Sequence, residues 1–332
     1  MLVYIKPLSV FPILHSDTIF GAILSAISEL YPNDIDDIVS KFQDNPPFIV
    51  SSAFPYIFNE TDKIRFFPKI IETNSKSKNN DLNEGIVDSS DVLATKKKFK
   101  TVEFIEEDLF FKLASGNIKE YDIINDLNNR KYSILNKNLL LENDARILEK
   151  QNKGFTQKYK KTITPQNTIN RITLESEAIF YSEGFEFINM GLFFLIDFKE
   201  KEYENILTSS IRFLKDRGFG RDISTGKGHF DYEIDNNYRL PDINGDYFIT
   251  LSRFIPSNED LNKINEFSGY EIDSKRGKSP FGEIRKQIRF FKEGSSFPYY
   301  KKFYGKIVES GKNSPSIEYG YAFPMKYNKG SD

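Results

Sequence analysis

The stretch "RGFGRDISTGKGHF" at residues 217–230 places four glycines, two arginines and a lysine in one short segment. Before it, "KEYENILTSSIRFLKDRG" (201–218) carries apolar residues at helical spacing and ends in glycine, which is a common helix stop. After it, "HFDYEID" (229–235) alternates as a strand does. The segment is therefore predicted to be a glycine-rich loop that joins a helix to a strand.

The elements around this loop decide the fold. Reading from the N-terminus, the pattern predicts a strand, a helix, two strands joined by a tight turn, a helix and a strand, namely 2–10, 17–30, 171–182, 185–198, 201–218 and 229–235, with the turn at Glu183 and Gly184. This is the order of a ferredoxin-like unit. The segment 31–170 is then predicted to be an insertion after the first helix.

The chain is predicted to hold two α+β domains in tandem. The first spans 1–236, with the insertion at about 31–170 and, inside it, a mobile loop at about 72–100. The tract 72–91 is rich in Asn, Ser, Lys and Asp and cannot bury enough apolar area to order itself. The second spans 244–326, is mostly β, and is interpreted as a degenerate copy of the same unit, although no sequence repeat proves this.

Composition excludes several classes of protein. The 332 residues contain no cysteine and two histidines, which excludes disulfides, thiolate metal sites and an all-histidine site. We therefore expect no metal and no cofactor. No run approaches the ~18 apolar residues of a membrane span, and the N-terminus lacks a signal-peptide pattern, which favours a cytoplasmic protein without a membrane partner.

The net charge of −2 argues against a protein that is basic over its whole surface. Basic residues are nevertheless clustered, for example in "KKKFK" (96–100) and "KDRGFGR" (215–221). Such segregation permits a basic groove on a nearly neutral protein. Each run taken alone is equally compatible with a solvated loop.

The glycine-rich loop has three interpretations. A nucleotide-hydrolysing P-loop is excluded, because five residues instead of four separate Gly220 from Gly226, and because the loop lies between helix and strand in the wrong order. A plain turn is the second interpretation. The third is a phosphate-binding loop, in which glycines expose backbone N–H groups while Arg217, Arg221 and Lys227 add charge.

Five motifs in order carry a family resemblance: "HSDTIFGAI" (15–23), "FFPK" (66–69), "NTINRITLESEAIFYSE" (167–183), "GFGRDISTGKGHF" (218–230) and "EYGYAF" (318–323). In this order they resemble the RAMP superfamily of CRISPR RNA-binding proteins, and most closely subunit 4 of the type III-A CRISPR effector, the Csm complex. The resemblance covers nearly the whole chain apart from 72–100. The first, third and fourth motifs are the specific ones.

The resemblance implies a tandem ferredoxin-like (RRM-like) fold and a non-catalytic role. Such subunits hold the 5′ repeat-derived tag of the guide CRISPR RNA. They also bind the large polymerase/nuclease-type subunit and the first backbone RAMP subunit, subunit 3. The implied RNA contacts are His15, Ser16, Lys69, Arg171, Arg217, Gly218, Gly220, Arg221, Ser224, Thr225, Gly226, Lys227 and Gly228. Asp222 departs from the basic pattern of relatives and is not expected to face a phosphate.

Two alternatives remain open. Some members of this superfamily cleave precursor RNA without metal, and His15 is the candidate general base, because a helix N-terminus disfavours the protonated ring. His229 is the other histidine, predicted on a strand. The second alternative is a scaffold that contacts only protein, with "IPSNEDLNKINEF" (255–267) or "FPYYKKFYG" (297–305) as its partner surfaces.

Overall fold

The computed structural model of the chain describes residues 1–59, 62–72, 90–129, 131–151, 158–220, 223–277, 284–311 and 316–329. The predicted mobile tract 72–91 lies almost entirely outside these ranges, as do Arg221 and Asp222. We call residues 1–236 the first half and residues 243–329 the second half.

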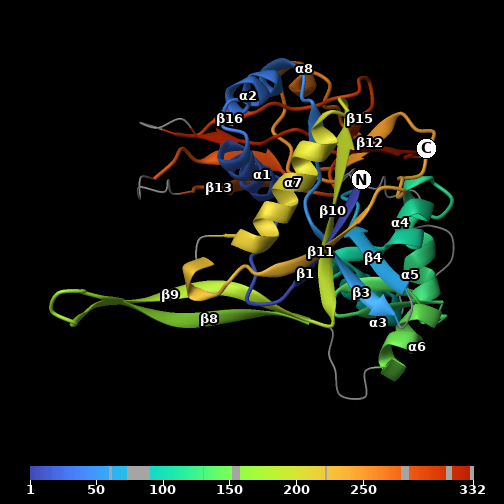
Figure 1. The fold of residues 1–332 in the computed structure, drawn as a ribbon. Helices are drawn as coiled ribbons and strands as arrows, with labels where there is room; N and C mark the ends of the chain where they lie inside the picture. The colour runs from blue at the N-terminus through green and yellow to red at the C-terminus, as the bar shows by residue number, and fades with distance from the viewer. Residues whose placement is uncertain are drawn as a thin grey trace.

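The first half is built on one large sheet that contains both antiparallel and parallel strand pairs (Figure 1). Within the described residues its strand order is β11-β1-β10-β3-β4-β5-β7-β6, and β2 also pairs with β10. The strands are β1 (Leu2–Pro7), β2 (Phe48–Val50), β3 (Phe54–Asn59), β4 (Asp62–Pro68), β5 (Phe104–Glu106), β6 (Tyr132–Leu135), β7 (Asn138–Leu141), β10 (Met190–Phe198) and β11 (Phe230–Asp235). β1 lies between β11 and β10, and its residues Leu2 to Ile5 are all buried.

The four strands β11-β1-β10-β3 have the spatial order of a ferredoxin-like unit, but the sequence-based assignment of one strand is wrong. The position beside β10 was predicted for 171–182 and is occupied by β3. β2 and β3 both pair with β10. Part of the segment 31–170 therefore belongs to the central sheet and is not an insertion outside it.

The predicted tight turn at Glu183-Gly184 is also wrong. Gly184 lies inside the long strand β9 (Ser176–Ile188), which pairs along its length with β8 (Lys158–Ile169). A Cβ on Gly184 would lie 2.3 Å from Cγ1 of Val10, so the glycine allows close approach of the chain after β1. β8 and β9 form a ribbon, the β8–β9 hairpin, that projects from the body of the protein (Figure 1).

The two predicted helices of the ferredoxin-like unit are present and pack side by side. They are α1 (Ser16–Leu30) and α7 (Tyr203–Arg217). Their apolar residues, including Ile19, Ile23, Leu207 and Ile211, join the main hydrophobic core. The shorter helix α2 (Ile35–Asp44) covers this core through Phe42, whose ring lies 4.7 Å from that of Phe20.

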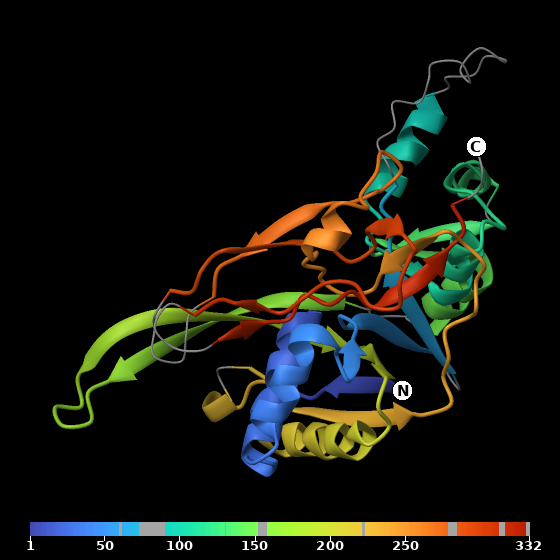
Figure 2. The same ribbon diagram turned by 90° about the horizontal axis from the view of Figure 1, so that it is seen from above.

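The other helices of the first half lie around the β4-β5-β7-β6 end of the sheet (Figure 2). They are α3 (Ser90–Lys100), α4 (Glu107–Ala114), α5 (Glu120–Asn128) and α6 (Glu142–Gln151). The segment 101–115 divides into β5 and α4. Residues Phe104–Glu106 of this segment form β5, which pairs with both β4 and β7.

The second half is mostly β, as predicted. Its described elements are β12 (Tyr247–Thr250), α8 (Asn258–Leu261), β13 (Ile272–Lys275), β14 (Ile288–Phe291), β15 (Ser296–Pro298), β16 (Val308–Glu309), β17 (Ile317–Glu318) and β18 (Pro324–Tyr327). Their small sheets are β15-β12-β18, β13-β14 and β16-β17. That this half is a copy of the first stays a prediction.

The two halves share one core. Tyr319 of "EYGYAF" is fully buried, and its ring lies 4.7 Å from that of Phe20 in α1. Its hydroxyl accepts a hydrogen bond from the backbone N–H of Val50 at 3.0 Å. The hydroxyl of Tyr321 donates to the carbonyl of Phe42 at 2.7 Å. Buried Tyr side chains need such partners, so this motif has a structural role.

Candidate nucleic-acid interface

The glycine loop, the segment between α7 and β11, is anchored by aromatic packing. Gly218 ends α7 with a φ of +97°, a conformation that glycine adopts without strain. The next residue, Phe219, is buried, and its ring centroid lies 5.8 Å from that of Phe11 and 5.2 Å from that of Phe230. The base of the loop is thus fixed to the core of the first half.

Three backbone N–H groups of the loop, those of Phe219, Gly226 and Gly228, donate hydrogen bonds inside the protein. The N–H of Gly226 donates to the carbonyl of Ile223 at 3.0 Å, and that of Gly228 donates to the carbonyl of Val10 at 2.9 Å. The N–H of Phe219 donates to the carbonyl of Gly228 at 2.8 Å. The interpretation that Gly226 and Gly228 present N–H groups to a phosphate is therefore wrong, because each group already has a carbonyl partner.

The two glycines that flank Lys227, Gly226 and Gly228, have different structural roles. A Cβ on Gly228 would lie 1.8 Å from the carbonyl oxygen of Phe219, so close packing of backbone requires glycine there. A Cβ on Gly226 would meet nothing within 4 Å, and only the φ of +81° favours glycine. Gly218 and Gly228 are buried, whereas Gly220 and Gly226 are exposed. Only the second pair lies where a ligand can reach.

The side chains of the loop contact the β8–β9 hairpin. Lys227 Nζ donates to the hydroxyl of Ser182 at 2.7 Å, and the amide of Gln166 donates to Thr225 Oγ1 at 3.4 Å. Loop and hairpin therefore form one continuous surface, which we call the loop–hairpin surface. Ser182 lies in the third quoted motif, and nothing in the sequence indicated that it would meet Lys227.

The remaining loop candidates lie elsewhere or are not described. Arg217 forms an ion pair with Glu29 of α1. Arg221 lies outside the described residues, and of Ser224 only the backbone is described, in the 3-10 turn η1 (Ile223–Thr225). Arg171 lies in the exposed turn between β8 and β9. The structure thus brings Thr225 and Lys227 to the hairpin but directs Arg217 toward α1.

The β8–β9 hairpin has two chemically different faces. Residues opposite each other in the register share a face, so Gln166 and Ser182 lie on the face that meets the loop. Ile163, Ile179 and Tyr181 lie on the other face, where Ile179 is 68% and Tyr181 70% exposed. A protein of this size rarely exposes such a stripe without a partner.

The N-terminus of α1 is a buried joint between the two halves, which we call the α1 joint. Ser16 is fully buried, and its hydroxyl accepts a hydrogen bond from the N–H of Arg253 at 3.1 Å. Asp17 is buried and forms ion pairs with Arg253, at 3.2 Å, and with Lys275. The prediction that Ser16 contacts RNA is therefore wrong, since the hydroxyl has no exposed surface.

His15 lies at the edge of the same joint. Its Nδ1 lies 2.9 Å from Glu293 Oε1, and the hydroxyl of Ser52 donates to the same oxygen at 2.5 Å. Burial alone would raise the pKa of Glu293, but the hydrogen bond and charge of His15, with smaller contributions from Ser52 and Arg253, lower it to about 2. Glu293 was missed by the sequence analysis, because no local motif marks its pairing with a residue so distant in sequence.

Lys69 lies with His15 in a cleft between the two halves, the inter-half cleft, with a volume of about 1380 Å³. Its Nζ donates to the carbonyl of Phe99 at 3.2 Å and lies 4.1 Å from the centre of that ring. Burial lowers the pKa of Lys69. Apart from the buried Ser16 and from Arg217 beside α1, the described candidates thus lie in two places, the loop–hairpin region and the inter-half cleft.

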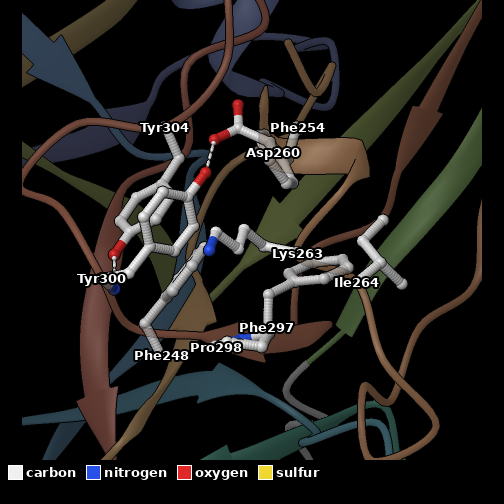
Figure 3. Close-up of a pocket in the computed structure, with 9 residues that line it drawn as sticks. All are labelled: Phe248, Phe254, Asp260, Lys263, Ile264, Phe297, Pro298, Tyr300 and Tyr304. Carbon is white, nitrogen blue, oxygen red and sulfur yellow. Dashed lines mark hydrogen bonds between the residues drawn. The ribbon is translucent and has the colours of Figure 1, made fainter. Parts of the chain in front are cut away.

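A second, much smaller pocket in the second half is closed by a buried carboxylate (Figure 3). Asp260 accepts hydrogen bonds from the hydroxyl of Tyr300 at 2.6 Å and from the N–H of Gly305 at 2.8 Å, and it pairs with Lys301 at 2.8 Å. The sequence signal for it is the capping box that begins at Ser257. With these partners Asp260 fixes loops and leaves no room for a ligand, so part of "FPYYKKFYG" is structural.

In the described part of the chain no cluster of three or more His, Asp or Glu side chains is placed to hold a metal ion. None of the described helices combines the length and the apolar character that crossing a membrane requires.

Comparisons with known proteins follow the two halves. The RAMP superfamily matches residues 5–231. The chain belongs to the RAMP superfamily. The CRISPR Csm4 C-terminal domain matches residues 243–327. A curated relative, the "CRISPR system Cms protein Csm4" of Thermococcus onnurineus (strain NA1), is 23% identical over 316 residues, which are 93% of this chain and 90% of the relative.

Solved structures share the fold of this RAMP protein. A chain of the crystal structure of a Csm3–Csm4 subcomplex in the type III-A CRISPR-Cas interference complex superposes with a TM-score of 0.65, at 18% identity, over 98% of this chain and 99% of that chain. A Csm1–Csm4 cassette crystallised with cA4 gives a TM-score of 0.56, at 18% identity, over 100% and 98% of the two chains. The matches to the Csm4 C-terminal domain and to the curated Csm4 relative confirm the resemblance to subunit 4 found in the sequence motifs.

Proposed function

We propose that the chain is the subunit of a type III-A CRISPR complex that holds the 5′ repeat-derived tag of the guide RNA. In this role it joins the large polymerase-type subunit to the first backbone subunit, as its relatives' complexes with Csm1 and Csm3 suggest. The proposal includes no catalytic step. It rests on the RAMP family and on one observation, the union of the glycine loop with the β8–β9 hairpin.

The loop–hairpin surface has the chemistry that an RNA backbone requires. Lys227 supplies a cation at the junction, and Thr225 supplies a hydroxyl on the exposed side of the loop. Gly220 and Gly226 are exposed and have no side chains, so an RNA strand can approach the loop closely at these positions. Cations contribute affinity for phosphates, and hydroxyls pair with phosphate and 2′-hydroxyl oxygens. The grip we propose is therefore made by side chains of the loop, and not by the N–H groups of Gly226 and Gly228.

The test is guide RNA retained by the assembled complex. Complexes are reconstituted with Lys227→Ala or with Lys302→Ala, which changes an exposed lysine of the second half far from the loop in sequence. RNA is extracted and counted per complex. We expect loss of RNA in the first variant alone. Equal retention in both variants would contradict the proposal.

Endonucleolytic cleavage is the second candidate, because Glu293 orients His15 as a carboxylate orients a general base. Lys69 lines the same cleft and offers a cation for a developing negative charge. The test is incubation of labelled repeat RNA with the pure protein in EDTA. Cleavage that His15→Ala abolishes would establish the enzyme; we expect none, since the His15 ring pairs with Glu293 in the inter-half cleft and the proposed role includes no catalytic step.

A further inference from the structure

The inter-half cleft has walls from both halves and a rigid floor. Lys69, Ile70 and Ile71 form part of the floor, and the N–H of Ile71 donates to the carbonyl of Gly294 at 2.9 Å. A Cβ on Gly294 would lie 2.1 Å from the carbonyl oxygen of Lys69. The chains from the two halves are thus in direct backbone contact beneath the cleft. Its volume of about 1380 Å³ exceeds the ~300–1,000 Å³ of small-molecule pockets and fits a peptide segment.

The charges of the cleft favour a cationic occupant. Glutamates outnumber lysines among the side chains that line it. Lys292 is already paired with Glu271 at 2.6 Å. Burial, followed by the charge of Glu72, raises the pKa of Glu120, and the charges of Lys69 and Lys100 oppose this rise without offsetting it. In the described part of the chain neither lysine forms an ion pair with Glu120. A cation that entered beside Glu120 would stabilise a carboxylate that is now half-buried.

The cleft also offers apolar surface for the rest of such an occupant. Ile13 is 41% exposed on one wall, and Tyr270 is 43% exposed on the wall from the second half. The ring of Tyr270 is held in place by that of Phe291, at 5.0 Å between centroids. Rigid aromatic surface beside a carboxylate is typical of the central part of protein interfaces.

One end of the cleft, at Ile13, follows Pro12, which lies against Gly220 of the glycine loop, and the other end lies away from the proposed RNA surface. Residues of β4, α3 and α5 line its first-half wall, and these elements lie at the end of the molecule opposite the tip of the β8–β9 hairpin in both views (Figures 1 and 2). If the guide RNA leaves the loop–hairpin surface toward the backbone subunits, those subunits lie on the hairpin side. The cleft is then open to the other partner.

From these observations we propose that the inter-half cleft is the docking site for a segment of the large subunit. The segment places a Lys or Arg side chain against Glu120 and an apolar residue between Ile13 and Tyr270. This rests on the proposed function for the identity of the partner. The charge of the cleft opposes a phosphate chain, so RNA is the alternative that the test must separate.

The affinity of the chain for its own large subunit is measured by titration, without RNA. Glu120→Gln is expected to weaken binding about tenfold, because one charge of a partly desolvated pair is lost. Lys69→Gln is expected to leave binding unchanged or tighten it. The control is Glu309→Gln, an exposed carboxylate outside the cleft. The same variants are also tested for binding of an RNA oligonucleotide. If Lys69→Gln weakens RNA binding, Glu120→Gln strengthens RNA binding, and neither changes binding of the large subunit, RNA is the occupant and the proposal is wrong.

The absence of cysteine gives a second, independent measurement. Ile13→Cys carries a photo-crosslinker into the cleft, and Leu261→Cys, 49% exposed on α8, carries it elsewhere. We expect Ile13→Cys alone to crosslink a large-subunit peptide that contains Lys or Arg. Crosslinks only within the chain would overturn the docking site while guide retention still stood. Failure of the unmodified chain to bind the large subunit would instead overturn the proposed assembly.

Discussion

The glycine loop and the α1 joint look alike in sequence and differ in structure. Both are short polar segments beside a helix terminus, and both were predicted to contact RNA. In the loop, Thr225 and Lys227 reach the hairpin at the surface. In the joint, Ser16 and Asp17 are buried and bonded to the second half.

Packing of the second half determines whether such a segment is exposed or buried. A serine and an aspartate at a helix N-terminus are exposed binding groups only while nothing packs over them. Arg253 supplies both an N–H for Ser16 and a guanidinium for Asp17, which turns a candidate site into an internal contact. The same division runs through the glycine loop itself, where Gly228 is internal and Gly226 is open.

The largest expected effect tests that division within the loop. Gly228→Val should destabilise the fold by about 4 kcal/mol, because its Cβ would overlap the carbonyl of Phe219 and its φ is +78°. Gly226→Val has only the positive φ against it and should lose about 1–2 kcal/mol. Urea unfolding of both variants measures the difference. Equal losses would show that the two glycines are not distinct.

The next effect concerns the ion pairs of the α1 joint. Asp17→Asn should destabilise the protein by about 3 kcal/mol, since it leaves the largely buried Arg253 without its carboxylate, whereas Lys275 keeps its ion pair with Glu318. Asp36→Asn, in the exposed first turn of α2, is the control and should stay within about 0.5 kcal/mol. A small loss for Asp17→Asn would mean that water reaches the joint and that it resembles a surface site.

A pH dependence distinguishes the edge of the joint from its centre. The pKa of Glu293 is lowered to about 2, so its ionised form stabilises the fold above the ordinary pKa and this contribution is lost as pH falls. Glu293→Gln should therefore lose about 2 kcal/mol at pH 7, and the gap from the unchanged protein should close between about pH 5 and pH 2. A gap that stays constant over this range would contradict the ion pair with His15.

The sequence predicted those parts of the fold that local patterns decide. α1, α7 and β11 follow from periodicity, and Gly218 from its place as a helix stop. β9 was assigned wrongly because a glycine inside a strand looks like a turn until Val10 is known to pack on it. β3 was missed as the neighbour of β10 because pairing across so many residues leaves no local signal.

The candidate site was predictable to the same extent. Thr225 and Lys227 were found because a glycine-rich loop concentrates reachable polar groups. Ser182 and Glu293 were not, because each meets its partner through tertiary packing alone. Burial of Ser16 was invisible for the same reason, since Arg253 lies far along the chain.

The variants that test the proposed function, Lys227→Ala and Ser182→Ala, have the smallest expected effect on stability. Lys227→Ala removes a cation and its hydrogen bond to Ser182, whereas Ser182→Ala removes only the bond. Both should change the free energy of unfolding by less than about 1 kcal/mol. If Lys227 grips the guide, only its own replacement should release RNA, and the slope of log affinity against log salt should fall by about one unit. If Lys227 merely fixes the hairpin, the two variants should release RNA alike, with the salt slope unchanged. The comparison thus separates a cation that meets phosphate from one that orders the surface beside it.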